Sequence, residues 1–127
     1  MASMTDYLEG KLLDHTLGLG AFSPPSGLYV ALFTTSTSDD GSGTEVTGGS
    51  YARQPVTFGP GSAPNERSKT NPVNFPNMPA VTVVSAAIYD AVILGNMLLH
   101  GPLTSPVVVD AGNTFAFAIG DIDVSMT

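Results

Sequence analysis

Hydrophobic and polar positions follow a helical period only at the start of the chain. Leu8, Leu12 and, with Tyr7, Leu13 form an apolar stripe at helical spacing, which predicts one helix over Thr5–Leu17. Acidic residues in its first turn and two glycines shortly after its end support these bounds. The stripe is narrow, so we expect this helix to pack on the body of the domain or on a neighbouring subunit.

After Pro25 the pattern becomes that of short β-strands. The segment Leu28–Thr34 is apolar on both faces, as is typical of a central strand that is covered on both sides. Alternating or β-branched runs predict further strands at Tyr51–Phe58, Pro72–Phe75, Ala80–Ala91, Met97–Leu103, Val107–Val109, Thr114–Ile119 and Asp121–Met126. No helical segment separates them, which excludes repeated βαβ units. The sequence therefore predicts a mainly β fold, an antiparallel β-sandwich or jelly-roll with one N-terminal helix.

Two polar segments without periodicity, 35–49 and 59–71, are predicted to be long loops. Pro55 cannot donate a backbone hydrogen bond, so it places the strand Tyr51–Phe58 towards a sheet edge. Together these features divide a single domain into an N-terminal helix or arm, residues 1–24, and a β-sandwich, residues 25–127.

Composition and charge exclude several classes of function. The 127 residues include 11 acidic and only 4 basic side chains, for a formal charge of −7, whereas a nucleic-acid-binding protein needs a basic surface. The same charge disfavours docking on anionic lipid. The longest apolar stretch, near Ala86–Leu99, is interrupted by polar residues and is too short for a membrane helix, and no signal peptide is expected. Cysteine is absent, which removes disulfides and thiol catalysis.

The residues that carry most catalysis and metal binding form no recognisable constellation. The two histidines, His15 and His100, lack a third ligand at metal spacing. The oxygen-rich segment Asp39–Glu45 does not follow the calcium-loop pattern, and Asp121 and Asp123 alternate with apolar residues as outward positions of a strand. No nucleophile elbow or phosphate-binding loop is present. We therefore expect no catalytic residue, no cofactor and no metal site.

Several segments of the chain resemble a family of small virion proteins of tailed bacteriophages, often labelled tail-fibre-like. The run Gly27–Thr35 is followed by Gly43–Phe58, and within the latter Gly43–Gln54 is the most specific stretch. Further similar segments are Thr5–Glu9, Asn74–Pro76, Ala87–Ala91, Gly95–Leu99 and Val109–Phe115, so the resemblance covers nearly the whole chain.

The resemblance implies a non-enzymatic structural protein of the phage particle. Capsid decoration (cement) proteins and tail fibre or neck adaptor proteins are both of this kind. The chain has no repeats or coiled-coil shaft, which favours a cement protein that binds between capsid subunits. A tail fibre or adaptor protein in host attachment remains the alternative. The expected partners are the major capsid protein or tail proteins, and further copies of the chain, with a trimer favoured.

Low surface charge also favours contacts with other subunits, because charge is depleted in the centre of protein interfaces. The expected contact residues are Tyr7, Leu8, Leu12 and Leu13 on the helix, with Arg53 as a basic anchor on a strand. An alternative for Arg53 is an ion pair within its own domain, to Glu45 or Asp90.

Overall fold

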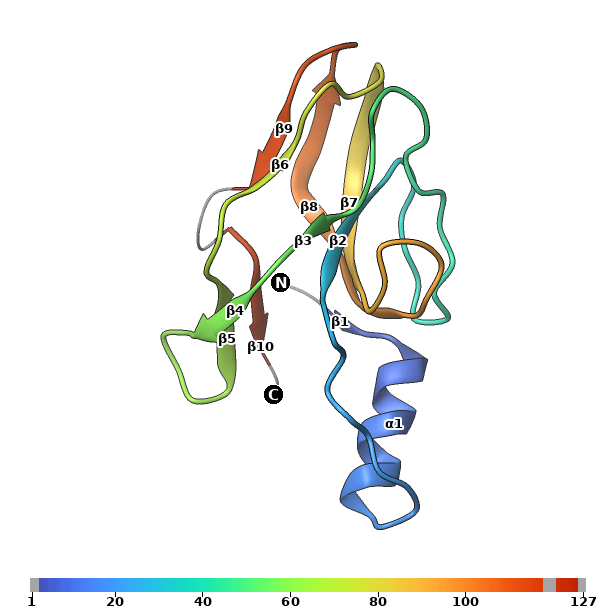
Figure 1. Ribbon diagram of the computed structural model, residues 1–127, viewed down its shortest axis with the longest axis vertical. Coiled ribbons are helices and arrows are strands. Elements are labelled where there is room, and N and C mark those ends of the chain that lie inside the picture. Colours follow the sequence, from blue (N-terminus) through green and yellow to red (C-terminus); the bar gives the residue numbers. More distant parts are fainter. Residues whose placement is uncertain (1–2, 118–120, 126–127) are drawn as a thin grey trace.

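A computed structural model describes residues 3–117 and 121–125, which form layers of antiparallel strands with one helix projecting from an end (Figure 1). In chain order the elements are β1 (Ser3–Met4), α1 (Asp6–Thr16), β2 (Tyr29–Phe33), β3 (Gln54–Pro55), β4 (Phe58–Pro60), β5 (Glu66–Lys69), β6 (Val73–Phe75), β7 (Val81–Tyr89), β8 (Met97–Val109), β9 (Phe115–Phe117) and β10 (Asp123–Ser125). This confirms the predicted mainly β fold with a single helix. The division at residue 24 remains a prediction.

The larger layer is a five-stranded sheet with the order β1-β8-β7-β2-β3. Within it, β2 lies between β7 and β3, and its residues Val30–Phe33 are all buried. This confirms the central strand that was predicted from a segment apolar on both faces. Pro55 lies in β3 at the edge of the sheet, where its missing N–H removes no necessary hydrogen bond.

The second layer consists of two small sheets, β10-β5-β4 and β6-β9. Between the layers lies the main hydrophobic core, to which both contribute alternate residues. Its aromatic side chains Tyr51, Phe75, Phe115 and Phe117 form a chain of stacked and edge-on ring contacts with centroids 5.1–6.2 Å apart. A smaller cluster occupies the opposite face of the five-stranded sheet, beneath the loops, and contains Ala31, Phe33, Ala87, Tyr89 and Met97.

One 13-residue strand, β8, replaces the two short strands predicted at its ends. Val83 pairs with Val107 and Ser85 pairs with Pro102, so residues 103–106 bulge opposite the single residue Val84. The bulge accounts for the interrupted pattern, since residues that leave the regular ladder no longer alternate between the two faces.

The prediction of a loop over 59–71 is wrong, because β5 lies within it and pairs with both β4 and β10. Its sequence, Glu-Arg-Ser-Lys, shows no alternation of apolar and polar residues. Lys69 nevertheless faces the interior and is only 1% exposed. Its ammonium donates to the backbone carbonyls of Asn71 (2.5 Å) and Phe117 (3.1 Å), which joins β5 to β9. Burial lowers the pKa of Lys69.

Candidate docking surfaces

Helix α1 is attached to the sheet at its first residues and projects from it (Figure 1). Its N-cap residue Thr5 is 1% exposed, and the Thr5 hydroxyl lies 2.6 Å from the carbonyl oxygen of Met97 and 3.1 Å from that of Leu98. The predicted helix is confirmed, with Thr5 as its cap and Leu17 at its end. This attachment fixes where the helix begins.

No residue of α1 is buried. Of the predicted contact residues, Tyr7 and Leu13 are exposed, at 36% and 58%, whereas Leu8 and Leu12 are half-buried. The segment beyond the helix adds Leu17 and Leu19, which are 67% and 78% exposed. The helix therefore carries large apolar side chains into solvent, as an arm would. That these residues contact a partner remains a prediction.

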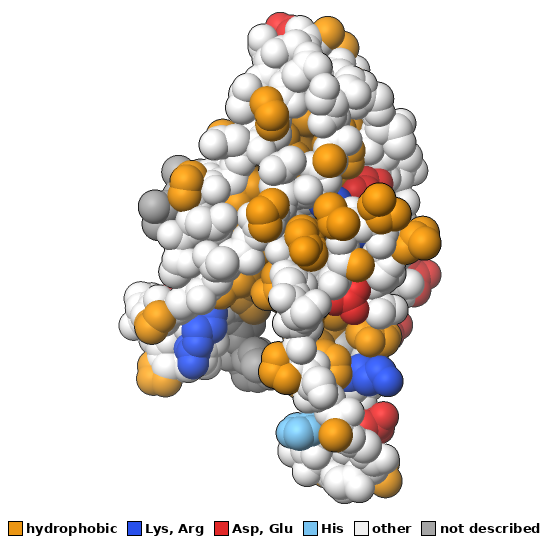
Figure 2. Space-filling model, viewed as in Figure 1, with side chains coloured by type: hydrophobic (Ala, Val, Ile, Leu, Met, Phe, Trp, Pro, Cys, Tyr) orange, Lys and Arg blue, Asp and Glu red, His pale blue; other side chains and the backbone are white. Residues whose placement is uncertain are grey.

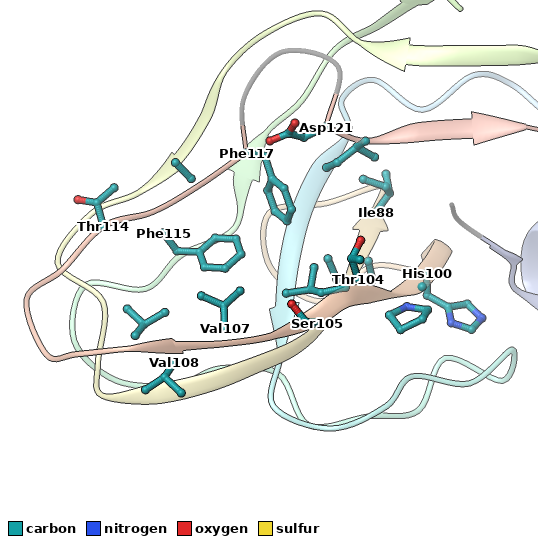
Figure 3. Close-up of a pocket in the computed structure, with 18 of the residues that line it drawn as sticks. Ile88, His100, Thr104, Ser105, Val107, Val108, Thr114, Phe115, Phe117 and Asp121 are labelled. Carbon is teal, nitrogen blue, oxygen red and sulfur yellow. The ribbon is translucent and has the colours of Figure 1, made fainter.

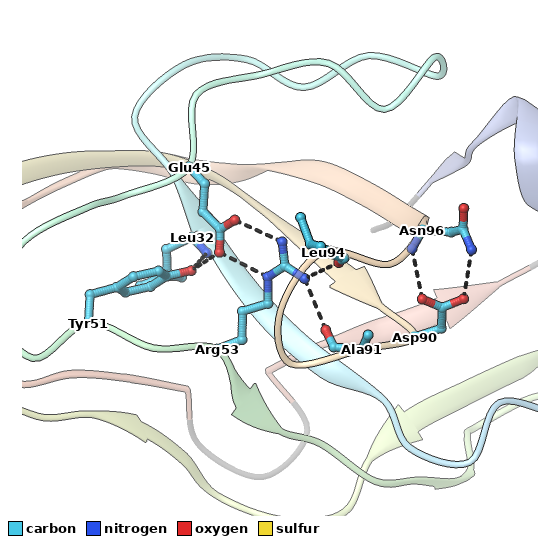
Figure 4. A network of polar contacts seen from close by, with 8 residues as sticks. All are labelled: Leu32, Glu45, Tyr51, Arg53, Asp90, Ala91, Leu94 and Asn96. Carbon is cyan, nitrogen blue, oxygen red and sulfur yellow. Dashed lines mark hydrogen bonds and ion pairs between the residues drawn. The ribbon is translucent and has the colours of Figure 1, made fainter.

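Arg53 is held within its own domain (Figure 4). Its guanidinium makes a two-pronged ion pair with Glu45, with Nη2–Oε1 at 2.9 Å and Nε–Oε2 at 3.0 Å, and only 9% of the side chain is exposed. The guanidinium also lies over the ring of Tyr89, 3.6 Å from its centroid. These contacts correspond to the alternative of an internal ion pair. The other expected partner, Asp90, instead accepts two hydrogen bonds from Asn96.

Tyr51 belongs to the same network of polar contacts as Arg53, because both side chains bind Glu45. Its hydroxyl donates to Glu45 Oε2 at 2.7 Å and accepts from the backbone N–H of Leu32 at 2.9 Å (Figure 4). Burial raises the pKa of the Tyr51 hydroxyl far above its ordinary value, and the hydrogen bond to Glu45 adds to this effect. Burial also acts to lower the pKa of Arg53, but the hydrogen bonds and charge of Glu45 outweigh it and raise that pKa.

The same guanidinium fixes the loop that joins β7 to β8. Arg53 Nη1 donates to the carbonyl oxygens of Ala91 (2.9 Å) and Leu94 (2.7 Å). The tip of this loop consists of Val92, Ile93 and Leu94, which are 48%, 74% and 81% exposed. We call these three residues the apolar tip. Figure 2 shows hydrophobic side chains gathered over this loop.

Sequence reasoning missed the apolar tip. The signal was present as three consecutive aliphatic residues directly before Gly95-Asn96, but the run was interpreted as part of an apolar stretch. Two positive φ angles, at Leu94 (57°) and Gly95 (76°), turn the chain so that these side chains leave the core.

Sites for chemistry are scarce in the part of the chain that the structure describes. No group of three His, Asp or Glu side chains that could hold a metal ion occurs among these residues. His100 lies between Thr37 Oγ1 (2.8 Å from Nδ1) and Asp39 Oδ1 (2.7 Å from Nε2), which satisfies both ring nitrogens. Within the same ranges, no helix is long and apolar enough to cross a membrane.

The model of one protein family matches residues 3–125, almost the full length of the chain. The family is described as Podophage GP4 fiber I protein gp80. The chain belongs to this family. Membership confirms the resemblance to small virion proteins of tailed phages, and it makes the chain a structural protein of the phage particle. No curated protein matches the sequence of this member of the fibre I family.

Proposed function

We propose that this fibre I family member is a non-enzymatic docking subunit, which joins the phage fibre to neighbouring virion proteins through its N-terminal arm. The observation that carries the proposal is the unburied helix α1. A helix of 11 residues with no fully buried side chain gains little stability from its own domain. Its exposed apolar residues Tyr7 and Leu13 become useful when a partner covers them.

The family description supports the fibre as the place of action. A second placement is on the capsid surface as a cement protein, and the absence of a repeat pattern within these 127 residues supports it. In both places the protein stabilises an assembly by mass action, because a subunit that binds only the assembled structure adds its binding free energy to it.

Labelling purified virions with gold-tagged antibody against this protein distinguishes the two placements. Label at the tail or neck, in few copies, supports the fibre. Label distributed over the head, in many copies, contradicts the fibre and supports a cement protein.

The role of the arm is tested with virions that lack the protein, to which purified variants are added back. Deletion of residues 1–17 is expected to abolish binding, but it also removes β1 and the buried Thr5. The double variant Leu13→Asp/Leu17→Asp keeps these anchors and alters only exposed side chains. Val108→Asp is the control, because Val108 is 74% exposed on β8, away from the arm. Full binding by the double variant would refute the arm as the docking element.

A further inference from the structure

We propose that the apolar tip of one copy of this chain inserts into a partly apolar groove of a second copy, so that the copies associate head to tail. The groove is a cavity of about 580 Å³ that opens between β8 and β9 (Figure 3). This contact joins copies of the chain to one another, and it goes beyond the proposed function because it does not depend on where in the particle they lie.

The apolar tip is held in shape before any partner arrives. Two hydrogen bonds from Arg53 fix the loop backbone, and Asp90 closes the base of the loop by accepting from the backbone and side chain of Asn96 (2.7 and 3.0 Å). Leu94 adopts a left-handed backbone conformation that is unfavourable for leucine. A rigid, strained loop with three aliphatic side chains in water has the properties of a preorganised contact surface.

The groove offers apolar side chains that the tip can contact. Apolar side chains line much of it, among them Ile88, Leu103, Val107 and Phe115, and Figure 3 shows Val107 and Phe115 pointing toward each other across it. Of the described lining residues, only His100 and Asp121 are titratable. The outer edge of β8, next to the groove, is also available for contact with a partner. On this edge β1 pairs only with Leu99 and His100, and no other described strand pairs with it.

The two surfaces of one chain suit each other in carrying little charge, which favours a second copy of the chain as the occupant. Two copies, each with a formal charge of −7, repel one another over most of their surfaces. The tip carries no charge, and the groove carries little, so this is a pair of surfaces at which copies can approach without placing carboxylates against each other. A partner recognised through charge would be expected to bind elsewhere on this acidic chain.

The positions of tip and groove determine the kind of assembly. The loop is fixed on the sheet face that bears Tyr89, through Arg53, whereas the groove opens on the side of the main core, which contains Ile88 and Phe115. The two surfaces therefore belong to opposite faces of the five-stranded sheet. A contact between different surfaces of identical chains is heterologous, and it produces a closed ring or an open row of subunits.

The test is sedimentation equilibrium of the full chain over a wide concentration range. The wild type is expected to self-associate reversibly. Ile93→Asp in the tip is expected to weaken association by about 30-fold or more, the factor for loss of a central interface side chain. Leu19→Asp is the matched control, because Leu19 is similarly exposed at 78% but lies outside the loop.

The groove is altered by Val107→Asp and, in a separate variant, by Thr104→Arg. The Thr104→Arg variant keeps the test possible if Val107→Asp does not fold. Thr82→Asp is the control on the adjacent strand β7, since Thr82 is exposed and pairs with Val108 but does not line the groove. Circular dichroism of each variant verifies that it is folded. The groove variants are expected to lose self-association by a similar factor, and the control to retain it.

Mixing the two defective variants gives the decisive result. Ile93→Asp retains an intact groove and Val107→Asp retains an intact tip, so the mixture is expected to form a one-to-one dimer that grows no further. A wild type that stays monomeric at every concentration would overturn the proposal. So would self-association that the tip and groove variants leave unchanged, or a mixture of the two that remains monomeric.

Discussion

Replacement of Arg53 by methionine tests whether the network around Glu45 stabilises the fold. The substitution keeps much of the side-chain length but removes the ion pair, both carbonyl hydrogen bonds and the cation over Tyr89. Breaking a buried ion pair by removing one partner costs about 3–5 kcal/mol. Since the side chain of Glu45 is 26% exposed and water can reach it, we expect a loss near the lower end, about 3 kcal/mol.

The loss is measured by urea unfolding, followed by far-ultraviolet circular dichroism because the chain has no tryptophan. Small domains have unfolding free energies of about 5–15 kcal/mol, so the variant should remain folded in the absence of urea. Arg67→Met is the matched control, since Arg67 is exposed and donates to the nearby carbonyls of Pro64 and Glu66. For this control we expect a change within about 0.5 kcal/mol.

A double-mutant cycle with Glu45→Gln separates the ion pair from the other contacts of Arg53. We expect a coupling free energy of about 1–3 kcal/mol between the two positions. Arg53→Lys keeps the charge but lacks the planar fork, so it should recover only part of the lost stability. The reasoning is wrong if Arg53→Met destabilises the protein no more than Arg67→Met does.

Three further predictions concern single side chains. The pKa of Tyr51 is raised in the folded state, so above pH 10 the folded protein keeps a proton that the unfolded chain has lost. The free energy of unfolding should therefore fall above pH 10, by up to about 1.4 kcal/mol per pH unit. Urea unfolding of Tyr51→Phe at several pH values should show a smaller decline. Thr5→Ala removes the helix cap and its buried hydrogen bonding to Met97 and Leu98, and thermal unfolding should show a loss of about 1–3 kcal/mol. Leu94→Gly relieves the left-handed backbone, so stability measured in urea should rise by about 1 kcal/mol, and a decrease would contradict strain at this position.

Local signals in the sequence were sufficient for much of the fold. The N-terminal helix was predictable because a cap, acidic first-turn residues and following glycines agree with the apolar stripe. The central strand β2 was predictable because burial on both faces leaves a continuous apolar run. Both depend mainly on residues close together in the chain.

Features that depend on distant residues were not predictable in the same way. Strand β5 consists of polar residues, and Lys69 faces inward only because carbonyls of Asn71 and Phe117 receive its ammonium. The loop that carries the apolar tip is held by Arg53, some 40 residues earlier in the chain, through carbonyls of the loop. Those acceptors are backbone atoms, which every residue possesses, so the sequence contains no specific signal for them.

The placement of the basic residues explains why apolar side chains are left to make contacts. Two of the four, Arg53 and Lys69, lie inside the domain and bind carbonyls or Glu45. Arg67 binds carbonyls next to it, and the ammonium of Lys11 lies 5.7 Å from the ring centroid of Tyr7. Cations therefore serve mainly to fix loops and strands, and the exterior is left acidic. Because an acidic exterior disfavours ion pairs between copies, the proposed contact between copies uses two surfaces that carry little charge, the tip and the groove.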